Sequence, residues 1–122
     1  MTVARQELGK LGEETAVREL EGRGYEILAR RYRTSRGEID IVARDGDTTV
    51  FVEVKVRATA EFGTAAEAVT AWKQRRLGAM ARDYLARNGG ANGPCRFDVV
   101  AIDGLGDEMR ITVYPHAFVL GR

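Results

Sequence analysis

The stretch 38-EIDIVARDGDTTVFVEVKV-56 decides the fold of this 122-residue chain. Its two halves, residues 38–44 and 49–56, are rich in β-branched side chains, which favour strands. Asp45-Gly46 lies between them, and this dipeptide is typical of a tight hairpin because both central residues of a type I′ turn need positive φ. The stretch therefore predicts two antiparallel strands at the centre of a sheet.

Two helices are expected, one before and one after this hairpin. Residues from about 5 to 23 are rich in Leu, Glu and Ala, and glycines bracket the end of the segment. A second helix is expected at about 71–88, with Thr70 as its N-cap and Gly89 at the start of its stop signal. Its inward-facing side chains are predicted to be Leu77, Met80, Ala81, Tyr84 and Leu85.

Three further strands complete the pattern. They are expected at residues 25–33, 96–102 and 111–114, and Pro115 is expected to end the last one. The order of elements is therefore α-β-β-β-α-β-β in a single domain spanning residues 1–122. This order favours the α/β class, with a central mixed β-sheet flanked by helices.

The composition argues against several classes of protein. No run of apolar residues is long enough to span a membrane, and the N-terminus is charged where a signal peptide is apolar, so we expect a cytoplasmic protein without a membrane partner. A single cysteine excludes an internal disulfide, and one histidine beside it leaves too few ligands for a structural zinc site. Any metal would be held by oxygen ligands, which favours Mg²⁺ or Mn²⁺.

The positive charge of the chain is mostly arginine, and it is clustered. Arginine outnumbers lysine 16 to 3, while the net charge is only +1. Arginine forks suit phosphate oxygens, so a local basic patch predicts nucleic-acid binding even in a nearly neutral chain. The candidate residues are Arg30, Arg31, Arg33, Arg36 and Arg57. The alternative is that these arginines form ordinary solvated surface, and composition does not decide between the two.

Acidic side chains from both strands of the hairpin are expected on one face of the sheet. Side chains alternate along a strand, so Glu53 and Lys55 project to one side, while the valines at positions 50, 52, 54 and 56 project to the other. A two-residue loop places Asp40 diagonal to Glu53, and a four-residue loop places the two directly opposite. In both registers Asp40 and Glu53 are neighbours on the same face.

Two carboxylates this close repel one another unless a cation neutralises them. A divalent ion held by Asp40 and Glu53, with the backbone carbonyl of Val54 and water, would lower the pKa of a bound water for attack on a phosphodiester. Lys55 would orient that water or neutralise the phosphate. Glu13, at the inward margin of the first helix, would supply a further ligand directly or through water. The alternative is a solvated sheet face on which Lys55 pairs with a neighbouring glutamate.

Several motifs, in this order along the chain, resemble a known family. They are G-x-x-G-E-x-x-A at 9–16, GY-x-IL-x-R at 24–30, GEIDIV at 37–42, FVEVK-x-R at 51–57 and RFDVV at 96–100. The set looks like the YraN-like family, which is related to Holliday-junction resolvases within the PD-(D/E)xK nuclease superfamily. The resemblance covers nearly the whole chain.

The resemblance implies a restriction-endonuclease-like fold and Mg²⁺- or Mn²⁺-dependent cleavage of DNA, branched and junction structures included, by a homodimer. It maps the superfamily's first-helix acid onto Glu13, its first sheet acid onto Asp40, and its E-x-K pair onto Glu53 and Lys55. Ile39 departs from the superfamily pattern, which has proline before the first sheet acid.

Two other functions stay open at this point. Members of this superfamily can keep the site and serve only as binding modules, so a catalytically silent nucleic-acid-binding or scaffolding protein is the chief alternative. A third hypothesis is an interaction module whose solvated sheet face docks a partner other than nucleic acid.

Several polar and aromatic residues have more than one interpretation. Glu38 is expected either to pair with Lys55 in a salt bridge or to support the metal ligands from behind. Lys73 either reaches the scissile phosphate from the second helix or extends its ammonium out of a packed stripe. Asp98 is expected to be a buried hydrogen-bonding group. For Trp72 and Tyr84, core or interface packing is favoured over stacking on exposed bases.

Overall fold

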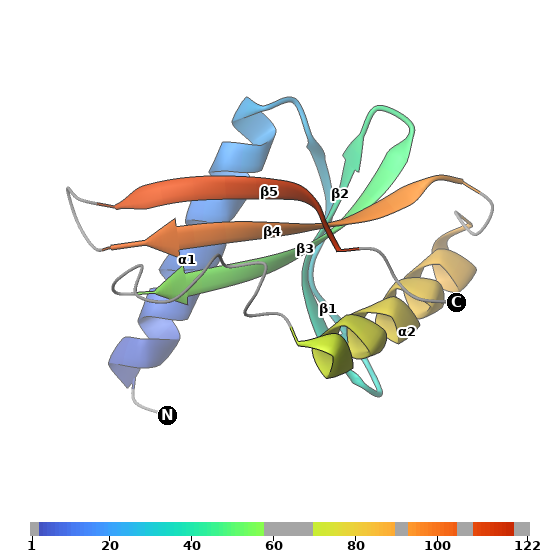
Figure 1. The fold of residues 1–122 in the computed structure, drawn as a ribbon, viewed down its shortest axis with the longest axis horizontal. Helices are drawn as coiled ribbons and strands as arrows, with labels where there is room; N and C mark the ends of the chain where they lie inside the picture. Colours follow the sequence, from blue (N-terminus) through green and yellow to red (C-terminus); the bar gives the residue numbers. More distant parts are fainter. Residues whose placement is uncertain (1–2, 58–69, 90–92, 105–108, 119–122) are drawn as a thin grey trace.

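The computed structural model describes residues 3–57, 70–89, 93–104 and 109–118 of the chain. The helices are α1 (Val3–Gly22) and α2 (Ala71–Asn88). The strands are β1 (Glu26–Thr34), β2 (Gly37–Asp45), β3 (Thr48–Arg57), β4 (Cys95–Asp103) and β5 (Arg110–Phe118). The predicted order α-β-β-β-α-β-β and the α/β class are confirmed (Figure 1). Neither helix in the described ranges is long and apolar enough to cross a membrane.

One five-stranded sheet forms the middle of the molecule, in the spatial order β1-β2-β3-β4-β5. β3 and β4 run parallel and the other neighbours run antiparallel, so the sheet is mixed as predicted. The parallel pair follows from the chain path, because α2 lies in the connection between β3 and β4 and a parallel pair needs such a crossover. Figure 1 shows α1 behind β3, β4 and β5, and α2 beside the lower end of the β1–β2 hairpin.

The two helices cover opposite faces of the sheet, and each has its own core. α1 contributes Ala16, Val17 and Leu20 to an apolar cluster that includes Val50 and Val52 of β3. α2 buries its apolar side chains in a second cluster built around Phe51. The stripe predicted from the sequence is buried as expected: Leu77, Met80, Ala81, Tyr84 and Leu85.

Local capping explains the bounds of α2, which agree with the prediction. The Lys73 N–H donates to the hydroxyl of Thr70 at 3.2 Å, which satisfies one of the free donors at the start of the helix. Gly89 follows the last turn with φ 78°, the left-handed conformation that ends many helices and that glycine adopts without strain.

The β2–β3 turn differs by one residue from the expected one. Asp45 pairs with Thr48, so Gly46 and Asp47 form the two-residue loop instead of Asp45 and Gly46. Of the two loop residues only Gly46 has positive φ, at 63°. The expected type I′ turn is therefore wrong, and one positive φ at the first central position fits a type II′ turn, which also suits the twist of a hairpin.

The expectation that Pro115 ends the last strand is also wrong. β5 continues through Pro115 to Phe118, since it is an edge strand in which a missing N–H need not cost a ladder hydrogen bond. The register shifts between Phe97 and Val99, and the N–H of His116 donates to Oδ1 of Asp98 at 3.1 Å. A bulge opposite a buried carboxylate therefore accommodates the proline.

Candidate functional site

The candidate site lies where β2 and β3 separate. The strands pair from Asp45–Thr48 to Ile41–Val52, which is the register expected for the longer loop, and Asp40 and Glu53 come next on the two strands. Beyond this point the Val54 N–H donates to Oδ2 of Asp40 at 2.8 Å, so the carboxylate itself bridges the strands.

A twist of β2 turns Asp40 out of the regular sheet. Ile39 packs in the core under α2, whereas Ile41 packs in the core under α1. Residues two apart in a regular strand share a face, so this change of face places the irregularity at Asp40, the residue between them. We call this place, with Asp40 on one strand and Glu53 on the other, the fork.

Glu53 and Lys55 share the face of β3 that is turned toward α2. Phe51 packs under α2 while the valines of β3 pack on the α1 side, so the predicted alternation is confirmed. Two cations of α2, Lys73 and Arg76, lie close enough to Glu53 for their charges to lower its pKa, as the charge of Lys55 also does. Acid and base from three elements therefore meet on this side of the fork.

Both carboxylates at the fork resist ionisation. The pKa of Asp40 is raised to about 6, first by burial and then by the negative charges of Glu13 and Glu38. The hydrogen bond from the Val54 N–H opposes this rise. The pKa of Glu53 is raised to about 7, first by burial and then by the charge of Asp40. The acids of the fork therefore compete for ionisation, and a bound cation is what relieves such competition.

Glu13 faces inward from α1, as predicted, while its neighbour Glu14 is exposed. Only 8% of Glu13 is exposed, and two arginines of β1 hold its carboxylate. The Nε atoms of Arg30 and Arg31 lie 3.4 Å and 2.9 Å from its two oxygens. Arg31 reaches Glu13 from a left-handed backbone with φ 53°, a conformation that costs free energy in a non-glycine residue.

The remaining predicted residues have other surroundings. Glu38 forms a salt bridge as predicted, but its partner is the exposed Arg33 at 2.9 Å and not Lys55, so the predicted partner is wrong. Arg57 pairs with Asp103 at 2.6 Å, and both side chains are mostly buried at the end of the parallel β3–β4 pair. Arg36 lies beside α2, where it lines a pocket. Arg57 is thus engaged inside the protein, whereas the other four candidate arginines are exposed.

The donors at the fork fit a hard divalent cation. Asp40 and Glu53 are half-buried acids without enough nearby positive charge to keep their pKa values low, and carboxylate and carbonyl oxygens suit Mg²⁺ or Mn²⁺. In the part of the chain that the structure describes, no three Asp, Glu, His or Cys side chains are already close enough to hold an ion together. Two causes keep the acids apart in the protein without metal: carboxylates repel one another when no cation lies between them, and Arg30 and Arg31 hold Glu13.

Asp98 has the buried hydrogen-bonding role that was predicted for it. Its side chain is 1% exposed and accepts from Arg96 Nε at 3.1 Å and from the Tyr25 hydroxyl at 3.4 Å. Arg96 also donates to the Tyr25 hydroxyl and to Asp45 at 2.9 Å. This network joins β1, β2 and β4 at the hairpin end of the sheet, which gives the RFDVV motif a structural role.

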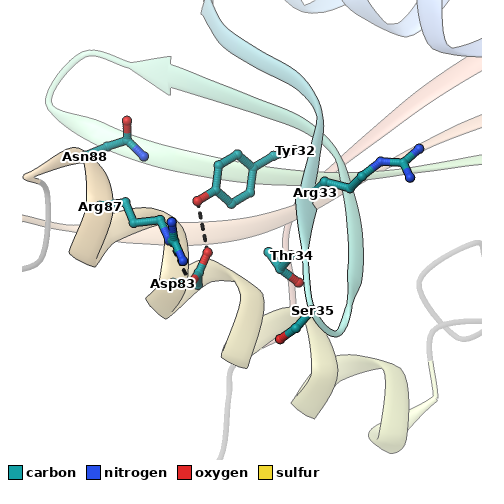
Figure 2. Close-up of a pocket in the computed structure, with 7 residues that line it drawn as sticks. All are labelled: Tyr32, Arg33, Thr34, Ser35, Asp83, Arg87 and Asn88. Atoms are coloured by element: carbon teal, nitrogen blue, oxygen red, sulfur yellow. Dashed lines mark hydrogen bonds and ion pairs between the residues drawn. The ribbon is translucent and has the colours of Figure 1, made fainter.

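A hollow of about 600 Å³ lies between the end of β1 and the C-terminal half of α2 (Figure 2). In it the Tyr32 hydroxyl and Arg87 Nε both donate to the carboxylate of Asp83, at 2.9 Å and 3.1 Å. These hydrogen bonds lower the pKa of Asp83, so its charge is balanced by its own neighbours. Arg33 points away from this cluster in Figure 2, and the acids of the fork do not line the hollow.

Two aromatic residues of α2 differ in exposure, although core or interface packing was expected for both. Tyr84 is buried and meets Tyr32 and Phe51 edge-on, with ring centroids 5.0 Å and 5.9 Å away. Trp72 is 60% exposed, so it does not pack in the core. The position of Arg76 near the carboxylates could not be predicted from the sequence, since it depends on how α2 packs against the sheet.

Comparison with known proteins points to one family. The model of a family described as "Uncharacterised protein family UPF0102" matches residues 12–102, which include every candidate residue named above. One relative is the UPF0102 protein STH1475 of Symbiobacterium thermophilum, 48% identical over 112 residues that cover 91% of this chain and 95% of the relative. Another, from Pelotomaculum thermopropionicum, is 43% identical over 120 residues, covering 97% of this chain and 100% of the relative. A third, from Geobacter metallireducens, is 44% identical over 120 residues and covers 98% of each chain.

Proposed function

The chain belongs to the UPF0102 family, and from its site we propose that it is a divalent-metal-dependent endonuclease that hydrolyses DNA, branched and junction structures included. The observation that carries the proposal is the pair of half-buried carboxylates at the fork, Asp40 and Glu53, whose pKa values are raised by partial burial and by neighbouring negative charge. The ammonium of Lys55 acts on the same face. The motif resemblance to PD-(D/E)xK nucleases supports the same assignment.

Mg²⁺ or Mn²⁺ would be held by the carboxylates of Asp40 and Glu53 and the backbone carbonyl of Val54, with Glu13 as a further ligand directly or through water. When bound, such an ion lowers the pKa of a coordinated water and neutralises charge on the phosphate. Because the raised pKa values leave the acids of the fork partly protonated near neutral pH, metal binding releases protons.

The side chains around the fork then bind and orient the substrate. Lys55 orients the attacking water or donates a hydrogen bond to a phosphate oxygen. The water oxygen bonds to phosphorus as its proton passes to solvent, and the bond to the leaving nucleoside oxygen breaks as that oxygen takes a proton from solvent. Lys73 and Arg76 lie on the α2 side of Glu53, where their charges suit a phosphate of the bound strand. Arg30 and Arg31 offer the same chemistry on the α1 side.

One observation favours the catalytically silent alternative. Glu13 is held by two arginines and no three acids are assembled among the described residues, so the protein without metal is not arranged for turnover. A DNA-binding or scaffolding protein that keeps the nuclease fold would bind DNA through Arg30, Arg31, Arg33 and Arg36 without cleaving it.

Metal binding and cleavage, measured separately, test the two functions. We expect Mn²⁺ binding by calorimetry to be lost in Asp40→Asn and Glu53→Gln. We expect Lys55→Ala to bind Mn²⁺ but to cleave linear, flapped and four-way DNA roughly a hundred-fold more slowly, the usual cost of removing a donor to the transition state. Lys10→Ala removes an exposed lysine of α1 and serves as the matched control.

The outcomes are distinct. If the wild-type protein binds Mn²⁺ and DNA but cleaves none of these substrates, the silent alternative replaces the nuclease. If Mn²⁺ does not bind, or binds equally well to Asp40→Asn, the metal site at the fork is wrong.

The proposal includes a homodimer, as the resemblance implies, in the cytoplasm, as expected from the sequence. A dimer would offer two forks to the two strands of a junction, so the stoichiometry matters for the substrate. Light scattering during size-exclusion chromatography measures the number of chains in each particle. A monomer at the concentrations used for cleavage would remove the dimer from the proposal.

A further inference from the structure

A second pocket lies on the α2 side of the fork and carries only positive charge. It has a volume of about 390 Å³ and is lined by Arg36, Trp72, Arg75, Arg76 and Ala79. No acidic residue lines it, in contrast to the hollow of Figure 2, where Asp83 balances the charge. Three guanidinium groups around one open volume favour an anionic ligand.

An exposed indole distinguishes this pocket from a simple phosphate site. Trp72 is 60% exposed although the opposite face of α2 builds the core. The guanidinium carbon of Arg76 lies 4.8 Å from the centre of its ring, a cation–π contact that holds the indole at the pocket. Aromatic rings beside arginines bind unpaired bases by stacking while the arginines bind the backbone.

Arg76 also has unused hydrogen-bonding capacity. Its Nε is buried and has no hydrogen-bond partner, which is true of no other side-chain nitrogen or oxygen in the described ranges. Gly37, the first residue of β2, lies close by, since a Cβ added there would be 4.0 Å from Arg76 Cζ. Buried donors in native proteins are nearly always paired, so an unpaired one beside an open pocket points to an acceptor that a ligand supplies.

The pocket adjoins the strand that leads to the fork. The guanidinium of Arg76 covers Trp72 and lies beside Gly37, where β2 begins three residues before Asp40. A strand with its scissile phosphate at the fork would therefore carry the neighbouring nucleotide to the indole. The volume lies within the range of about 300–1,000 Å³ that small-molecule sites occupy.

We propose that the pocket formed by Arg36, Trp72, Arg75 and Arg76 binds one unpaired nucleotide of the DNA strand, with its base stacked on Trp72 and its phosphate on the arginines. This inference rests on the proposed nuclease function and narrows its substrate class. The substrates are DNAs with a single-stranded segment beside the cleaved bond, such as flaps and splayed arms, in preference to continuous duplex.

Trp72 is the only tryptophan of the chain, so its fluorescence reports the pocket directly. We expect a short oligothymidylate to quench this fluorescence saturably in EDTA, where no cleavage occurs, and a blunt duplex of equal length to quench it less. By anisotropy of a labelled oligothymidylate, Trp72→Ala should bind roughly ten-fold more weakly and Trp72→Phe about as well as wild type, because stacking needs only an aromatic face.

Two further variants test whether binding depends on the arginines of the pocket or on positive charge anywhere on the protein. Arg75→Ala should weaken binding of the oligothymidylate, whereas Arg18→Ala, which removes an exposed arginine of α1, should not. The circular dichroism spectrum and melting temperature of Trp72→Ala should match wild type because the side chain is exposed. Absence of quenching, equal binding by Trp72→Ala, or equal quenching by duplex would overturn the proposal. Tighter binding of oligouridylate would overturn the choice of DNA as the ligand.

Failure of the pocket and failure of the nuclease have different signatures. Quenching in EDTA without cleavage by any metal would leave the pocket and remove the nuclease. The opposite result is metal-dependent cleavage that needs Asp40, proceeds equally well on blunt duplex and on flaps, and is accompanied by no quenching. It would support the nuclease and overturn the nucleotide pocket.

Discussion

At the residue scale, Glu13 has two sets of partners that compete for it. Without metal its carboxylate binds Arg30 and Arg31, and a cation at the fork would draw it toward Asp40. Helical periodicity was enough to predict that Glu13 faces inward and Glu14 outward. The partners of Glu13 could not be predicted, because Arg31 reaches it only from a left-handed backbone that residue type does not indicate.

Exchange of partners at Glu13 predicts coupling between metal and DNA. Glu13→Gln should weaken Mn²⁺ binding. In EDTA it should bind DNA about two- to five-fold more tightly, because Arg30 and Arg31 are released to contact phosphates. This factor corresponds to the free energy of a partly exposed ion pair. The exposed neighbour provides the control, since Glu14→Gln removes the same charge and should alter neither affinity. Calorimetry and anisotropy measure both, and identical behaviour of the two variants would contradict the exchange.

At the element scale, the position of α1 determines how far Glu13 can reach. α1 touches β3 at Gly12, where an added Cβ would clash with Cγ2 of Val56. Gly12 precedes Glu13 directly, so the close approach of helix and strand sets the depth at which Glu13 sits. The ends of α2 could be predicted from the sequence because its caps are local, whereas the continuation of β5 beyond Pro115 could not, because it depends on β5 being an edge strand.

Two glycines of α1 offer a matched test of this contact. Gly12→Ala should lower the free energy of unfolding by about 1–3 kcal/mol, the usual cost of overpacking, and should weaken Mn²⁺ binding by moving Glu13 away from the fork. Gly9→Ala has nothing within 4 Å of its added Cβ and should instead stabilise the helix by about 0.5–1 kcal/mol. Urea denaturation of both variants decides the matter. Equal effects of the two substitutions would show that α1 is not fitted closely to β3.

In the whole molecule, the fork lies between the two apolar cores. Ile39 is buried under α2, and the valines of β3 that follow Glu53 pack on the α1 side. The half-buried acids Asp40 and Glu53 therefore have an apolar cluster beside them on each face of the sheet. Alternation along single strands predicted that Asp40 and Glu53 would be neighbours. The extent to which they are buried could not be predicted, because it depends on the packing of both helices and on the strand order, and a local sequence pattern determines neither.

This burial makes the stability of the metal-free protein depend on pH. Unfolded carboxyl groups have a pKa near 4, so between about pH 4 and pH 7 the folded protein holds protons at the fork that the unfolded chain has released. The free energy of unfolding should therefore fall as pH rises through this window. Ionisation of buried acids without a cation costs roughly 1.4 kcal/mol for each unit by which a pKa is raised.

Asp40→Asn removes one of these acids and keeps an oxygen to accept from the Val54 N–H. It should therefore be more stable than wild type by about 1–3 kcal/mol at about pH 8 in EDTA, and by much less at about pH 5. With Mn²⁺ at about pH 8 the wild-type protein should instead be more stable than Asp40→Asn, because only the wild-type fork binds the ion. Asp47→Asn, in the exposed turn, should follow the wild-type curve. Urea denaturation at the two pH values measures the difference, and parallel curves for wild type and Asp40→Asn would mean that this acid is not buried at the fork.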